Sequence, residues 1–325
     1  MTRRRGGTVA ARSASSAPPS TSSPAPAGRT PRRRAAGPAR RRKLTGLLLI
    51  SPALLLVAVF FLAPLGLTVW MSLHKWPLLG TPEWSGLDNY AAIPGDRTFL
   101  DALVYTVLYT VIITPLLLFI GLGLAFLVRD QRRGVGIFRT VWFLPYVFGF
   151  ASSAYLFLWL FDSSVGFVDR VLMDLGLTDA PVQWMNSADT ATTAVIVMVV
   201  WKVVGFQMLL LMAGLQSVPD EVNEAALMDG SGRWSTLLRI TLPLLRRHVA
   251  LVLVFSVSGS MLAFEQFFIM TGGGPGNETL TVVHWIYNSS FANFQLGYGS
   301  ALSVLLLVLL MIVNGIQLFL LRERD

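Results

Sequence analysis

The sequence contains no cysteine and little charge. None of its 325 residues is Cys, and only 14% are Asp, Glu, Lys or Arg, whereas soluble domains carry about 25% charged residues. The lack of cysteine excludes disulfide bonds, thiolate zinc sites and a cysteine nucleophile. Low charge combined with 54% hydrophobic residues indicates a membrane protein.

Lysine and histidine are also scarce, which limits the chemistry available to the chain. A phosphate-binding P-loop requires Gly-x-x-x-x-Gly-Lys-Ser/Thr, and that context surrounds none of the lysines Lys43, Lys75 and Lys202. The histidines are too far apart in the sequence to suggest metal-ligand spacing. We therefore expect no catalytic residue, no bound metal, no cofactor and no ATP hydrolysis by this chain itself.

The net charge of +8 comes from the N-terminal tail. Residues 1–43 hold 12 of the 26 Lys and Arg but none of the 18 Asp and Glu, and they are otherwise rich in Ser, Ala, Pro and Gly. Such a segment cannot bury a core, so we expect it to be disordered. Its arginine clusters are typical of a cytoplasmic anchor beside anionic lipid head groups. Nucleic-acid binding is not expected, because no folded module or interleaved aromatic residue accompanies them.

The rest of the chain, residues 44–325, is predicted to be an all-α membrane domain with six transmembrane helices. A bilayer core takes about 20 helical residues, and its lack of water forces each continuously apolar run to be helical. The six runs of sufficient length are approximately 44–72, 99–128, 137–161, 191–215, 248–270 and 298–321.

The distribution of Lys and Arg predicts the orientation in the membrane. With the N-terminus inside, the cytoplasmic segments carry 22 basic residues and the outer loops carry three. Basic residues concentrate on the cytoplasmic side. Both termini are therefore expected in the cytoplasm.

The cytoplasmic segment 216–247 is too polar to span a membrane and carries clear helix signals. Ser217 is a good N-cap, and the acidic residues that follow favour a helix start. Gly230 and Gly232 indicate a break after about Asp229, and Pro243 indicates an end or kink before the fifth span. We expect two short helices at the inner membrane surface, with Ala225 and Ala226 giving a flat face that another protein can approach.

This segment resembles the "EAA" signature of permease subunits of bacterial binding-protein-dependent ABC importers. Glu224-Ala225-Ala226, then Gly230, then Ile240-Thr241-Leu242-Pro243 match it at every defining position. Gly86-Leu87-Asp88-Asn89-Tyr90, Trp201-Lys202, Thr271-Gly272-Gly273-Gly274-Pro275 and Gly297-Tyr298-Gly299-Ser300-Ala301 resemble the carbohydrate-uptake branch, particularly maltose and glycerol-phosphate permeases. Gly299 departs from the family, which more often has Ala there.

The resemblance implies the type I importer permease fold in a bacterial cytoplasmic membrane. It also implies partners: a second permease subunit, a cytoplasmic ATP-binding subunit dimer that binds the ATP, and an extracellular solute-binding protein that docks on loops 74–98 and 272–297. Contact with the ATPase would fall to the coupling residues Glu224, Ala225, Ala226, Asp229, Gly230, Ile240, Leu242 and Pro243.

Lys202 and Glu265 are the two charged residues that lie inside the predicted spans and away from the first few residues of each, where a charge is costly and often functional. An ion pair between spans, a polar solute cavity lined by both, and a proton relay are all open interpretations. By resemblance the last three spans form the solute site, which adds Gln266 and Asn314 as pathway candidates. Ser256, Ser258 and Ser260 could join such a cavity, but small residues of this kind, with Gly259, more often serve close helix packing, and that interpretation is favoured.

The leading interpretation is a passive translocation subunit of an ABC importer for a sugar or related polar solute. Glycerol phosphate or another polyol fits the sequence equally well. The main alternative is an ion-coupled secondary transporter that uses Lys202 and Glu265; it predicts inverted repeats, and the two halves show no evident pairing. A membrane enzyme would need a catalytic cluster, which is missing.

Overall fold

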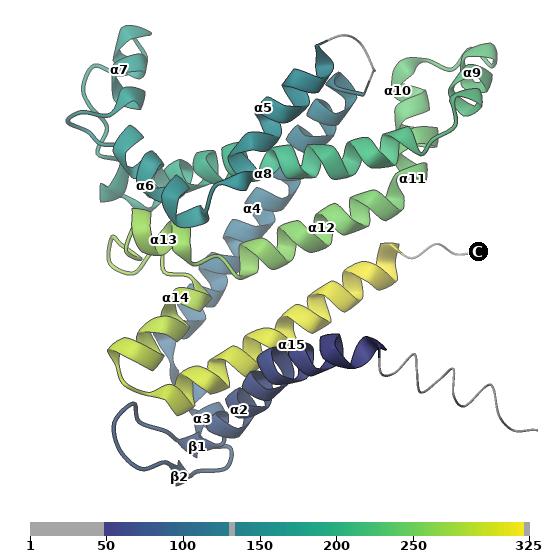
Figure 1. Cartoon of the computed structure of the whole chain (residues 1–325). Coiled ribbons are helices and arrows are strands. Elements are labelled where there is room, and N and C mark those ends of the chain that lie inside the picture. Colours follow the sequence, from purple (N-terminus) through teal and green to yellow (C-terminus); the bar gives the residue numbers. More distant parts are fainter. Residues whose placement is uncertain (1–48, 130–133, 322–325) are drawn as a thin grey trace, which may run out of the picture. The chain divides into compact units, whose positions relative to one another are not determined.

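The computed structural model describes residues 49–129 and 134–321, and its regular structure is almost entirely helical (Figure 1). The chain divides into two units, Met1–Leu56 and Val57–Asp325. Of the first unit only the helical residues 49–56 are described, so the basic tail 1–43 lies outside the described residues. The features below belong to the second unit except where the first span is named.

Four helical runs are long and apolar enough to cross a membrane: Leu49–Ser72, α4 (Arg97–Leu127), α8 (Ala188–Gln216) and α15 (Leu296–Leu321). Two further pairs of helices pass the same test but are bent sharply at a short break. Counting each pair as one span gives six, so the described residues contain four to six spans.

The segment predicted as the third span, 137–161, is two helices rather than one. Helices α5 (Val135–Val147) and α6 (Phe150–Leu160) meet at 98°. Phe148 and Gly149 between them are extended, with ψ angles of 152° and 150°. Pro145 in the last turn of α5 cannot donate a helical hydrogen bond, which favours ending the helix here.

The segment predicted as the fifth span, 248–270, is also interrupted. Helix α12 (Arg246–Met261) ends within the segment, and α13 (Glu265–Met270) follows after Phe264, whose φ and ψ of −137° and −65° leave the helical region. At its other end α12 bends by 70° from the helical run Leu237–Leu244.

Two wide helical turns each precede a proline. The π-helical turn η1 (Ala58–Leu62) comes before Pro64 in α2 (Ala63–Ser72), and η4 (Leu237–Thr241) comes before Pro243 in α11 (Leu242–Leu244). A proline ring clashes with the carbonyl four residues earlier, and a wider turn relieves that clash. Pro243 lies in the last turn of the run Leu237–Leu244, and the 70° bend into α12 follows directly, so the expected end or kink at Pro243 is confirmed.

Helix α8 is the centre of the packing and contacts α4, α5, α6, α12 and α13. Its closest neighbour is α5, because a Cβ atom on Gly205 of α8 would lie only 1.9 Å from the carbonyl oxygen of Trp142. Helix α15 packs along α2 and α12. The buried core follows these contacts, with one apolar cluster that includes Tyr109, Met198 and Phe267.

Shorter elements cap the helical bundle at its two ends (Figure 1). At one end α9 (Asp220–Met228) and α10 (Arg233–Thr236) lie beyond α8 and α12. At the other end lie β1 (His74–Lys75), β2 (Glu83–Trp84), α3 (Asp88–Ala92), η2 (Ile93–Gly95), α7 (Phe167–Asp174), η3 (Trp184–Asn186), α14 (Val282–Tyr287) and η5 (Asn288–Ala292).

Asp96 joins three helices at this second end. Its Oδ1 accepts a hydrogen bond from the Phe99 amide at 3.0 Å and caps α4, while Oδ2 accepts from Trp285 Nε1 of α14 at 2.9 Å and from the Tyr298 hydroxyl of α15 at 2.7 Å. Burial alone would raise the pKa of Asp96, but the hydrogen bonds from Phe99, Tyr298, Trp285 and the Thr98 amide outweigh it and hold the pKa below its ordinary 3.8.

We expect Asp96→Ala to lower the free energy of unfolding by about 2 kcal/mol, because it removes a helix cap and two hydrogen bonds to a charged group. A carboxylate with a lowered pKa stabilises the fold above its ordinary pKa, and that contribution disappears as the pH falls through the folded-state value. Thermal unfolding in detergent should therefore show a loss of wild-type stability below pH 3.8 that is much smaller in the variant. Equal pH dependence of the two proteins would contradict this role.

Candidate functional site

A cavity of about 280 Å³ lies among α4, α5, α6, α8, α12 and α13, at the level of the two helix breaks. Its wall combines aromatic rings with hydroxyl and amide groups. The aromatic rings include Tyr109, Tyr146, Phe206 and Phe255, and the amide groups are those of Gln207 and Gln266. Such a mixture, mostly apolar with a few polar groups, is typical of small-molecule sites.

The aromatic part of the wall is held rigidly. Tyr146 and Phe206 stack with ring centroids 4.5 Å apart and planes 7° apart, and Phe206 meets Phe255 edge-on at 5.6 Å. Tyr109 is fully buried and packs edge-on against Phe267 at 5.0 Å. These rings could not be identified from the sequence, because an apolar run gives no indication of which of its aromatic residues faces a cavity.

The polar part of the wall comes mainly from α8 and α12. Gln207 donates from Nε2 to Ser256 Oγ at 2.6 Å, while its buried Oε1 has no hydrogen-bond partner. Ser256, Ser258, Gly259 and Ser260 all line the cavity. These small residues, for which the sequence favours close helix packing, therefore also contribute to the cavity wall. Their small side chains leave space for the cavity beside α12.

Lys202 is buried beside this cavity and has a different set of partners from those expected. Its Nζ donates to the carbonyl oxygen of Phe148 and, at 3.5 Å, to that of Tyr146. The ammonium also lies 4.6 Å from the centre of the Phe150 ring, a cation–π distance. Lys202 thus satisfies the carbonyl groups left unpaired where α5 ends.

The other three pathway candidates lie in different surroundings. Glu265 is exposed in the first turn of α13, and the described residues show no ion pair between it and Lys202. Gln266 is 5% exposed and lines the cavity. Asn314 of α15 donates from Nδ2 to Ser258 Oγ at 3.0 Å, so it borders the cavity through a lining residue.

The segment expected to couple to an ATPase forms α9, α10, η4 and α11 in succession. Glu224 lies in α9, but its side chain is outside the described residues. Ala225, Asp229 and Gly230 are exposed. Ala226 is only 3% exposed, so the expectation of an open face at both alanines is wrong for the second: it turns toward the chain's own interior.

Gly230 has a φ of +70°, in the left-handed region that favours glycine. The Ser231 amide just beyond it donates to the Ala226 carbonyl at 2.9 Å. This arrangement closes the end of α9. Ile240 and Leu242 are half-buried, and Pro243 is exposed.

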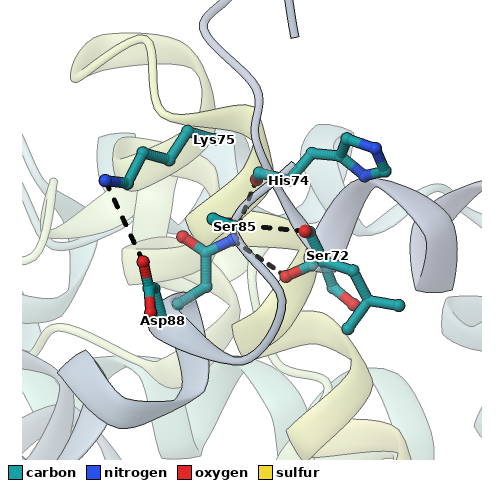
Figure 2. Close-up of polar contacts among 7 residues, drawn as sticks. Ser72, His74, Lys75, Ser85 and Asp88 are labelled. Carbon is teal, nitrogen blue, oxygen red and sulfur yellow. Dashed lines mark hydrogen bonds and ion pairs between the residues drawn. The ribbon is translucent and has the colours of Figure 1, made fainter. Parts of the chain in front are cut away.

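The Gly86–Tyr90 motif holds the hairpin that follows the first span (Figure 2). Asn89 donates from Nδ2 to the Ser72 and His74 carbonyls at 2.8 and 2.9 Å. Lys75 and Asp88, both largely exposed, lie 4.0 Å apart. This motif therefore stabilises the backbone at the end of the first span.

The Thr271–Pro275 and Gly297–Ala301 motifs are also structural. Thr279 donates its hydroxyl to Thr271 Oγ1 at 2.8 Å and closes the glycine-rich turn. A Cβ atom on Gly297 would lie 2.1 Å from the His74 carbonyl, and one on Gly299 would lie 1.9 Å from Ser290 Oγ. An alanine at position 299 would therefore clash with Ser290 of η5 in this structure.

Residues 90–324 match the family model described as "Binding-protein-dependent transport system inner membrane component". The chain belongs to this family. It is a permease subunit of an ABC importer and an inner-membrane component of the transport system.

Several characterised relatives align over most of their length. The sulfoquinovosyl glycerol transport system permease protein of Agrobacterium fabrum is 34% identical over 85% of this chain and 90% of its own. The trehalose/maltose transport system permease protein of Thermococcus litoralis is 33% identical over 81% and 88%. The sn-glycerol-3-phosphate transport system permease protein of Yersinia pestis is 30% identical over 82% and 90%.

Solved structures show the same fold. A bacterial ABC transporter that imports alginate matches with a TM-score of 0.74 at 19% identity, covering 87% of this chain and 96% of that chain. A second structure of a bacterial alginate transporter, in complex with an alginate pentasaccharide-bound periplasmic protein, has the same TM-score at 18% identity.

We expect Lys202→Met to destabilise the protein by about 2 kcal/mol, because it leaves buried carbonyl groups at the α5–α6 break without a donor. Glu265→Gln is the matched control, since Glu265 is exposed and its replacement should change stability by less than about 0.5 kcal/mol. Thermal unfolding of the purified variants measures both. If Lys202→Met is as stable as the wild type, Lys202 does not support the break.

Proposed function

We propose that the chain carries a sugar or a closely related polyol through the cavity between α8 and α12. The observation that supports this most directly is the cavity wall, which combines stacked aromatic rings with serine hydroxyls and glutamine amides. Aromatic faces suit the C–H faces of a pyranose, and the polar groups suit its hydroxyls. The names of the relatives, which include trehalose/maltose, lactose and sulfoquinovosyl glycerol permeases, agree with this class of solute.

The chain acts as a non-catalytic subunit in this proposal and binds neither metal nor cofactor. ATP is bound and hydrolysed by a separate cytoplasmic subunit dimer. A second permease completes the membrane part, with both termini of this chain in the cytoplasm. Among the described residues, His, Asp and Glu form no group of three or more that could hold a metal ion.

The ATPase contact is assigned to the α9–α11 segment. Its exposed residues Ala225, Asp229 and Gly230 lie at the turn where α9 ends, and Glu224 precedes them in the sequence. The segment leads through η4 and α11 directly into α12, which carries part of the cavity wall. The segment therefore connects α9 to the proposed solute site through α10, η4, α11 and the 70° bend into α12.

The extracellular solute-binding protein is assigned to the opposite end of the bundle. A depression of about 430 Å³ there is lined by residues from the β1–β2 hairpin and the start of α15, including Trp76, Glu83, Phe294 and Tyr298. Backbone hydrogen bonds join its walls, from Leu78 to Phe294 at 3.0 Å and from Gly297 to Trp76 at 3.1 Å. A fixed concave surface of this kind can receive a protruding side chain from the binding protein.

An ion-coupled mechanism has less support. It requires Lys202 and Glu265 to exchange ions or protons, but Lys202 is occupied by backbone carbonyls, and the described residues hold no ion pair between the two side chains. Sealed vesicles that contain the isolated complex distinguish the mechanisms, because only the ABC importer needs ATP on the cytoplasmic side.

We expect Gly259→Phe to stop uptake of the transported sugar, with maltose, trehalose and lactose tested in turn as radiolabelled probes. Gly259 lines the cavity, and a Cβ atom there meets nothing within 4 Å, so the ring can enter the cavity without a clash. Gly315→Phe in α15 is the matched control: it also has open space at Cβ but lies outside the cavity. Equal uptake by the two variants would argue against this route.

We expect Gly230→Pro and Glu224→Lys each to abolish ATP-driven uptake while the protein still inserts. Proline fixes φ near −65° and cannot adopt the +70° of Gly230, and lysine reverses the charge proposed to meet the ATPase. Gly232→Ala is the control, since its Cβ has open space. Co-purification with the ATPase and uptake in vesicles are measured; normal uptake in both variants would remove the coupling assignment.

A further inference from the structure

An apolar groove lies at the end of the helical bundle that carries α9 and α10. It has a volume of about 550 Å³ and is formed by α4, η4, α11, α12 and α15. Its lining residues are Leu118, Phe119, Leu122, Leu238, Leu242, Pro243, Arg246, Val249 and Leu321. The transport cavity does not account for it, and two of the expected ATPase-coupling residues, Leu242 and Pro243, lie in its wall.

The groove has the apolar lining of a lipid-chain site. Its walls are leucine, valine, proline and phenylalanine side chains, and Phe119 and Leu238 are 70% and 59% exposed. Exposed apolar side chains on a membrane-spanning bundle face either acyl chains or another protein. The walls of the groove offer too few polar groups to bind a polar solute.

Arg246 is the one charged residue among the lining residues that the structure describes. Its Nη2 donates to the main-chain carbonyl of Leu320 near the end of α15, which fixes the head of the side chain beside the groove. An arginine presents five N–H donors in a planar fork that matches phosphate. No carboxylate lines the described part of the groove, so the local charge is complementary to an anion.

The position of the groove along the spans agrees with binding of an anionic group. Arg246 begins α12 immediately after the α9–α11 segment, at the end of the spans where the basic residues concentrate. That is the cytoplasmic leaflet, whose anionic lipids attract arginine by roughly 1 kcal/mol per residue.

We propose that this groove binds an anionic phospholipid, with one acyl chain between α4 and α12 and the phosphate on Arg246. Leu242 and Pro243 form part of the wall, so the bound lipid also contacts the segment that leads from α9 into α12. This inference goes beyond the proposed transport function and does not depend on the identity of the solute.

The test uses the full-length chain, in the assembly in which it is purified, in nanodiscs of phosphatidylcholine and phosphatidylglycerol at 3:1. Native mass spectrometry counts the phosphatidylglycerol retained after release. We expect Arg246→Gln to reduce the retained phosphatidylglycerol about fivefold, the effect of roughly 1 kcal/mol. Arg246→Lys should keep most of it, because the charge remains.

Two further variants separate the lipid site from general loss of charge or fold. Arg239→Gln removes a charge from η4 outside the groove and should leave lipid retention unchanged. Leu122→Trp fills the groove while Arg246 stays, and should also displace the lipid. Unchanged retention in Arg246→Gln, or an equal loss in Arg239→Gln, would overturn the proposal.

The second permease is the other possible occupant, and the cysteine-free sequence allows a direct comparison. A Phe119→Cys variant, labelled at the new thiol with a photo-crosslinker, should capture phosphatidylglycerol in the nanodisc. Capture of the partner permease in place of lipid would show that a protein helix fills the groove, and the lipid assignment would be withdrawn.

Discussion

The backbone of a membrane-spanning chain must find its hydrogen-bond partners inside the protein, and the structure depends on how this requirement is met where helices break. Water is missing from the bilayer core, so an unpaired carbonyl there costs several kcal/mol. The chain nevertheless ends α5 and bends by 98° in the middle of a predicted span. Lys202 makes this possible by donating to the carbonyls of Tyr146 and Phe148. The break in turn places Tyr146 and Phe150 on the cavity wall.

The features that the sequence predicted correctly are those that depend on composition and local pattern. The long apolar runs forced helices, and the EAA signature together with the loop motifs indicated the ABC permease family to which the chain belongs. The helix break near Gly230 followed from glycine chemistry and is present, with Gly230 at φ +70°. Each of these predictions needed only residues that lie close together in the chain.

The features that the sequence could not predict depend on contacts between distant segments. Hydropathy gives no signal for the breaks in the apolar runs 137–161 and 248–270, because it measures transfer to the bilayer and not backbone geometry. Pro145 is a local signal in the first run, but a proline is also tolerated inside an unbroken transmembrane helix. The partners of Lys202 lie 54 and 56 residues away along the chain, so no spacing rule could find them. The same holds for the serines of α12: small residues suit helix packing and cavity lining equally, and only the neighbouring helices determine which applies.

The hairpin after the first span has a mechanical consequence. Hydrogen bonds from Asn89 join the hairpin to the end of α2, and the Gly297 amide joins it to the start of α15. Asp96, at the first turn of α4, accepts a further hydrogen bond from α15. The ends of the first and last spans beside the hairpin are therefore held together by hydrogen bonds. Any movement of one of these two ends has to carry the other with it.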